Sequence, residues 1–281
     1  MRDLNGDYFN MGASFCDGNN CHFLKYPGSL DMNNYQVMGT IESCFPNHIG
    51  YIHTYGMTDN YFVFCEQPCR FYARIHGRRT QLLLHHVQKN RKIINFVNCN
   101  EYENHAVIDA MDFNASDFYS FMSHKSSISS QFFPKDLNLS STWRQENNIV
   151  MLRPQYPFSE SECMYRCINT NFNCREYQYS YAQCGNSIIK FDSENGRTLT
   201  WRGENEFRTP FRSMFVPNPS GMCEDDGVLV SCCYQSRDNF PKNYMVFINA
   251  HNMEEISRLD CDSPLSFGSS DSFYSPHFMQ W

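Results

Sequence analysis

The residues that could bind a transition metal are few and widely spaced along the chain. His53 lies in an aromatic-rich stretch, and Leu84-His85-His86-Val87 holds two adjacent histidines. Imidazole is a common ligand for iron, zinc and copper. A single His on a strand, however, is far more often a hydrogen-bonded residue of the core or surface than a ligand. These histidines therefore specify a metal site only if the fold brings further ligands to them.

The chain holds 14 cysteines, but their spacing does not follow a metal-binding pattern. Cys65 and Cys69 are separated by three residues, as are Cys163 and Cys167, and no His pair follows at zinc-finger spacing. No apolar run follows Met1, so we expect no signal peptide. We therefore expect reduced, mostly buried cysteines in a cytoplasmic protein.

Composition favours an ordered protein rich in β-strands. Hydrophobic residues make up 41% of the 281 residues and charged residues only 19%, which argues against disorder. The 24 Phe and 17 Tyr favour strands over helices. A net charge of −7 with scattered basic residues does not fit a nucleic-acid-binding protein, so we expect no nucleic-acid partner.

Short strand-like runs recur along the chain with turn residues between them. Asn195-Gly196 joins two of these runs and predicts a β-hairpin. Many short strands at even spacing are typical of a sandwich, a barrel or a propeller, and composition alone does not choose among them. The runs are 8–12, 61–65, 106–110, 187–192, 199–201, 227–233 and 244–248.

One long block resembles a known family. The residues from Ile49 to Pro68 are similar to S-Y-V-H-S-F-G-M-T-E-N-Y-I-V-F-V-E-Q-P of the animal carotenoid cleavage oxygenases. Further blocks follow in that family's order, and the likeness covers Asp3 to about Phe267. These further blocks, each with the matching family motif in parentheses where one is given, are residues 3–12 (D-x-D-G-x-x-Y-N-M-G), 98–109 (N-A-Y-E and I-V-I-D), 185–192 (G-D-S-L-I-K-V-D), 215–229 (F-V-P and E-E-D-G-V-V-L) and 263–267.

The resemblance implies an all-β fold, part of a seven-bladed β-propeller, for residues 1–268, with a divergent tail at 269–281. It also implies Fe(2+) on the propeller axis, held by four His, three of them oriented by Glu. The expected activity is oxidative cleavage of a carotenoid or apocarotenoid with O2. Peripheral contact with a membrane, from which such lipids are collected, is a further expectation.

When the four His ligands of the family are matched to this sequence residue by residue, the resemblance implies that one of them is present. His53 falls on the second ligand position. Asn95 occupies the third, and Gly268, directly after Phe267, occupies the fourth. The family block A-H-P-H, which carries the first ligand, would precede Met1. His85, in a motif displaced by an insertion, is an alternative third ligand.

Two positions of the supporting Glu residues also differ. Arg212 stands at one of them and Met164 at another, with Glu162 as a nearby stand-in for the second. We therefore expect this chain alone neither to bind iron nor to cleave a polyene. Three interpretations stay open: an active enzyme of which this sequence is an incomplete part, an inactive paralogue that binds an isoprenoid, and a relic without function.

Overall fold

The computed structural model of the chain is built almost entirely of β-strands. Its described part forms nineteen strands and one short 3-10 helix, η1 (Thr170–Phe172). No helix in that part has the length and apolar character needed to cross a bilayer. The structure describes residues 6–14, 19–28, 31, 33–43, 52, 54–66, 69–76, 79–86, 91–102, 105–114, 137–146, 149–155, 163–203, 208–235 and 243–260.

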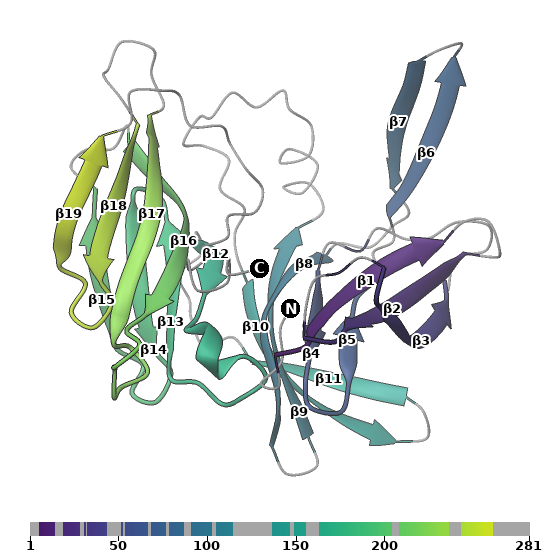
Figure 1. Cartoon of the computed structure of the whole chain (residues 1–281), viewed down its shortest axis with the longest axis horizontal. Coiled ribbons are helices and arrows are strands. Elements are labelled where there is room, and N and C mark those ends of the chain that lie inside the picture. The colour runs from purple at the N-terminus through teal and green to yellow at the C-terminus, as the bar shows by residue number, and fades with distance from the viewer. Residues whose placement is uncertain are drawn as a thin grey trace.

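The strands form antiparallel sheets in which neighbours in sequence are neighbours in space (Figure 1). The first sheet has the order β1-β2-β3, and two pairs, β4-β5 and β6-β7, follow it. Three four-stranded sheets come next, in the orders β11-β10-β9-β8, β12-β13-β14-β15 and β16-β17-β18-β19. The bounds are β1 (Tyr8–Ser14), β2 (Asn20–Tyr26), β3 (Gln36–Glu42), β4 (Tyr55–Met57), β5 (Phe62–Phe64), β6 (Cys69–His76), β7 (Arg79–His86), β8 (Arg91–Tyr102), β9 (His105–Asn114), β10 (Leu137–Glu146), β11 (Ile149–Gln155), β12 (Cys163–Cys167), β13 (Tyr179–Cys184), β14 (Ser187–Asp192), β15 (Thr198–Arg202), β16 (Arg208–Pro217), β17 (Gly227–Gln235), β18 (Tyr244–Asn249) and β19 (Glu255–Asp260).

Such four-stranded meanders are the blades of a β-propeller, so the expected all-β, partial seven-bladed propeller is confirmed. The hairpin predicted at Asn195-Gly196 is also present, between β14 and β15. Gly196 has a φ of 68°, a conformation that glycine adopts without steric cost. The division into residues 1–268 and a tail at 269–281 stays a prediction, because the tail lies outside the described residues.

Consecutive sheets pack face to face through aromatic side chains. At the N-terminal end, the ring of Phe23 on β2 lies 4.5 Å from that of Phe62 on β5, in a stacked arrangement. On its other side, the β4-β5 pair contacts β8, where Val63 and Cys65 pack against Phe96 and Cys99. Successive sheets are therefore joined by apolar contacts, as neighbouring blades are.

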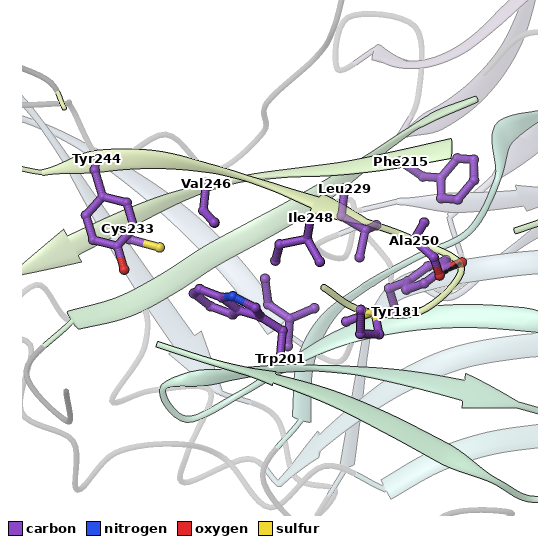
Figure 2. Packing of buried hydrophobic residues seen from close by; sticks show 11 residues of the cluster. Tyr181, Trp201, Phe215, Leu229, Cys233, Tyr244, Val246, Ile248 and Ala250 are labelled. Carbon is purple, nitrogen blue, oxygen red and sulfur yellow. Dashed lines mark hydrogen bonds between the residues drawn. The ribbon is translucent and has the colours of Figure 1, made fainter. Parts of the chain in front are cut away.

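The largest core lies between the sheets β12–β15 and β16–β19 (Figure 2). Trp201 of the first sheet points towards Val246 and Ile248 of the second. Tyr181 and Phe215 meet across the same interface with their ring centres 5.5 Å apart. Each of these side chains contributes about 1.5–3 kcal/mol by leaving water, so the interface holds the two blades together.

Polar side chains of β8 connect this strand to the elements on both of its sides. Asn98 of β8 donates to the carbonyls of Phe172 and Arg175, at 3.2 and 2.8 Å, and accepts from Cys174 N at 2.9 Å. Glu101, three residues further on, accepts from Thr58 Oγ1 at 2.5 Å. The strand β8 is thereby bonded to the β4-β5 turn on one side and to η1 and the loop after it on the other.

Candidate functional site

Three of the family positions lie on the first strands of three successive sheets. Asn95 belongs to β8, Met164 to β12 and Arg212 to β16. Each of these strands lies at one end of its sheet. In Figure 1, β12 and β16 lie nearer the middle of the molecule than the outer strands β15 and β19. The fold therefore gives the three positions equivalent places in their blades.

Each of these strands has an irregular register at or beside the family position. In β8, the pairing with β9 shifts on both sides of Asn95. In β12, it shifts between Met164 and Cys167. In β16, it shifts between Phe211 and Met214, so that Arg212 and Ser213 together oppose one residue of β17. A bulge redirects side chains and is common beside active sites. The three register shifts make the first strands of these sheets a candidate site.

The charges that act on the thiol of Cys167, on β12, are both positive. Burial raises the pKa of this thiol to about 12, while Arg212 on β16 and, more weakly, Arg166 act to lower it. Arg166 is 8% exposed, and its Nε donates to Ser180 Oγ at 2.9 Å. Its guanidinium also lies 5.5 Å from the centre of the Phe191 ring. The contact between β12 and β16 therefore brings the guanidinium groups of Arg212 and Arg166 close to one thiol.

Two buried polar atoms in this region have no hydrogen-bond partner among the described residues: Ser213 Oγ and Gln183 Oε1. Both residues are 3% exposed. Ser213 belongs to the bulge of β16, and Gln183, on β13, pairs in register with Met164. A buried polar atom without a partner costs about 1–3 kcal/mol, which makes this position unusual for a purely structural interior.

These observations do not fit an octahedral iron site. The described residues contain no group of three or more His, Cys, Asp or Glu that could hold a metal ion. Arg212 is a cation at a position where the family resemblance predicts a carboxylate that orients an imidazole. An amide such as that of Asn95 is a weak ligand for Fe(II) compared with imidazole.

The other predicted site residues do not add to this site. His53, Glu162 and Gly268 lie outside the described residues. His85 is in β7, paired with Arg70 of β6. Figure 1 shows this two-stranded hairpin extending away from the four-stranded sheets, so the structure gives His85 no support as the third ligand.

The expectation of reduced cysteines is wrong for one pair. Cys163 and Cys184 form a disulfide. They face each other in the register of β12 and β13, with their Cα atoms 4.2 Å apart. Their separation of 21 residues in sequence gave no sign of this, because cross-strand contact depends on the register. Buried free thiols such as Cys99 and Cys233 do agree with the expectation.

Sequence reasoning also missed the function of two motif residues. Asn98 and Glu101 were noticed only as part of a family block, yet they hold β8 between its neighbours. Their signal was the polar pattern of the motif within a strand, since a buried polar side chain needs partners. The bulges and the unpartnered Ser213 had no sequence signal, because both depend on how strands pair.

The family model and the curated relatives that match this chain point to the same family. Residues 78–270, more than half of the chain, match the model of the family described as retinal pigment epithelial membrane protein. Carotenoid isomerooxygenase of Galleria mellonella is 26% identical over 81% of this chain and 53% of its own length. The 15,15'-dioxygenase of β,β-carotene from Mus musculus is 22% identical over 94% of this chain and 59% of its own.

Solved structures agree on the fold. A variant of Synechocystis apocarotenoid oxygenase superposes with a TM-score of 0.64 at 15% identity, covering 90% of this chain and 57% of that protein. The cobalt-substituted form of that oxygenase gives a TM-score of 0.62 over the same shares. This chain spans little more than half the length of these relatives. The family match nevertheless covers most of its blades, and the chain belongs to the retinal pigment epithelial membrane protein family, which includes the carotenoid dioxygenases.

Proposed function

We propose that this protein binds a carotenoid or apocarotenoid and that the chain, by itself, does not carry out iron-dependent cleavage of it. The observation that carries the proposal is Arg212 in the bulge of β16, beside the half-buried Cys167 of β12. A guanidinium stays charged in proteins, so it would repel a ferrous ion at this position.

The class of ligand rests on the relatives. They are named for carotenoid or apocarotenoid oxygenation, and the described part of this chain shares their blades. Fe(2+) and O2 belong to the proposal only at the level of the family, because the described side chains do not fit the metal. A protein that keeps the fold and loses the metal ligands retains a means of binding the polyene but not of oxidising it.

A second candidate function is supported by the length of the match. The chain covers 53% and 59% of two relatives, and among the described residues β1 pairs only with β2. A strand from further polypeptide would complete the first sheet along the edge of β1. In that case the chain is one part of a cleaving oxygenase, and His53 serves as one of its iron ligands.

The two candidates differ in what the purified chain does with β-carotene under air. Binding without cleavage predicts a shift of the polyene absorbance and quenching of tryptophan fluorescence, with no retinal formed and no oxygen consumed. Iron content, measured after loading with Fe(II), should be equal in the unmodified chain and in His53→Ala. Stoichiometric iron that is lost in His53→Ala, together with oxygen-dependent cleavage, would replace the first candidate by the second.

A further inference from the structure

The bulge of β16 presents two consecutive side chains with hydrogen-bond donors. Arg212 and Ser213 both oppose Ser231 of β17. The hydroxyl of Ser231 is already used, since it donates to the carbonyl of Phe211 at 2.5 Å. The hydroxyl of Ser213 has no partner among the described residues although it is buried. A guanidinium has five N–H donors in a planar arrangement that suits a carboxylate.

The adjacent strand adds positive charge at the same level. Arg166 lies in the register shift of β12, and Cys167 next to it responds to both arginines. Arg166 is fixed in place by Ser180 and the ring of Phe191. Because this contact is largely buried, the field of the two cations is weakly screened. Both side chains are cations, so an anion is the charged ligand that they would attract.

We propose that the bulges of β12 and β16 bind the carboxylate end of an isoprenoid ligand, with Arg212 as its ion partner and Ser213 as a hydrogen-bond donor. This inference rests on the proposed function, which supplies the isoprenoid part of the ligand. It specifies the ligand class further, as a carotenoid-derived acid. Arg166 acts at longer range and makes the site more positive.

The test compares ligands that differ only in the end group. All-trans-retinoic acid and all-trans-retinol share one polyene chain, and palmitic acid offers a carboxylate without a polyene. Dissociation constants are measured by tryptophan quenching with the full chain. Charge-assisted hydrogen bonds contribute about 1.5–3 kcal/mol, so retinoic acid should bind about 10- to 100-fold more tightly than retinol. Palmitic acid should bind more weakly than retinoic acid.

Variants then locate the anion site. Arg212→Gln should weaken retinoic acid to the level of retinol and leave retinol unchanged. Arg212→Lys should keep part of the preference, and Ser213→Ala should lose a smaller part of it. Arg202→Gln, on the exposed edge of β15, is the matched control and should behave as the unmodified chain. If Arg212→Gln does not fold, methyl retinoate, which keeps the polyene but lacks the carboxylate, should bind the unmodified chain no more tightly than retinol does.

The outcomes separate the two levels of the proposal. Equal binding of retinol and retinoic acid, or an unchanged preference in folded Arg212→Gln, contradicts the anion site but leaves polyene binding intact. Palmitic acid binding as tightly as retinoic acid contradicts the isoprenoid assignment. Failure of retinol and retinoic acid alike to bind contradicts the proposed function, and the anion site with it.

Discussion

Lys190 and Asp225 form a buried ion pair that joins two neighbouring sheets. Lys190 Nζ, on β14, lies 2.6 Å from Asp225 Oδ2 in the loop between β16 and β17, and each side chain is 5% exposed. Lys190 also donates to the carbonyl of His251 at 2.8 Å and lies 4.2 Å from the centre of the Tyr179 ring. The ammonium group thus has partners from both sheets at the edge of their shared core.

Removing one partner of this pair should strongly destabilise the chain. Asp225→Asn leaves a buried ammonium without its counter-charge, and such changes cost about 3–5 kcal/mol. Urea unfolding followed by circular dichroism measures the loss. Lys190→Met should restore part of the stability when combined with Asp225→Asn, because the unpaired charge is then gone.

The more exposed pair between Glu255 and Arg258 is the matched control, with both side chains 25% exposed. Arg258→Gln should cost about 1 kcal/mol or less. Equal effects of Arg258→Gln and Asp225→Asn would mean that the buried pair does not hold the two sheets together.

Gly56 should be intolerant of any side chain. It lies on β4 where that strand contacts β8, and an added Cβ would overlap Cys99 Sγ. We expect Gly56→Ala to cost about 1–3 kcal/mol in chemical unfolding, since the interior is already closely packed. Gly39→Ala on β3 is the control, because no atom lies within 4 Å of its added Cβ.

A second substitution identifies the cause. With Cys99→Ala the sulfur is absent, and the nearest atoms to the new methyl group are Cys99 Cβ at 3.3 Å and Phe96 Cδ1 at 3.4 Å. The double variant should therefore be more stable than expected from adding the two single effects. Strict additivity would assign the cost of Gly56→Ala to the backbone and not to this contact.

Glu101 should make the stability of the chain depend on pH. The hydroxyl of Thr58 and then the amides of Asn60 bond to its carboxylate and hold its pKa below the ordinary value of 4.5. A lowered pKa in the folded state stabilises the chain above pH 4.5, and this stabilisation is lost as the pH falls through the folded-state pKa.

The corresponding experiment follows the melting temperature of Glu101→Gln and of the unmodified chain from about pH 7 to about pH 3. The variant should be less stable at neutral pH, and the difference should shrink in acid. Glu194→Gln, in the exposed turn after β14, controls for the loss of one negative charge. A difference that stays constant with pH would show that the bonds of Glu101 do not depend on its ionisation.

Local sequence pattern predicted seven of the nineteen strands of the described residues, but not how the strands contact one another. The predicted strand-like runs and the Asn195-Gly196 hairpin lie in strands or in the turns between them, as does the block around Met57 and Asn60. Local sequence pattern and turn chemistry determine such elements. The bulge at Arg212 could not be predicted in the same way. It depends on a register shift between β16 and β17, which no single strand encodes.

The site was predicted only in part for the same reason. The resemblance assigned Asn95, Met164 and Arg212 to positions of the family's iron site, and this assignment stays a prediction. The closeness of Arg212 to Cys167 and the unpartnered hydroxyl of Ser213 both depend on how strands far apart in sequence pack together. Their proximity is a property of the packed sheets.

The disulfide between Cys163 and Cys184 yields the last prediction. It links the first strand of its sheet to the second, beside the register shift of β12. Closing a loop of this length restricts the unfolded chain and stabilises the folded one by about 3 kcal/mol. Reduction with a phosphine should therefore lower the melting temperature, and Cys163→Ser should be as unstable without reductant as the unmodified chain is with it.

The exposed thiol of Cys223 supplies the control. Cys223→Ser should keep both the stability and the response to reductant, because Cys223 takes no part in the cross-link. Peptide mapping of the native chain without reductant should recover the Cys163 and Cys184 peptides joined. Cys163 is buried and Cys184 half-buried, so a small reductant reaches the bond mainly from the side of Cys184. If both thiols were instead alkylated in the native, air-exposed chain, these cysteines would be reduced neighbours, and β12 would be held to β13 by its backbone hydrogen bonds and packing alone.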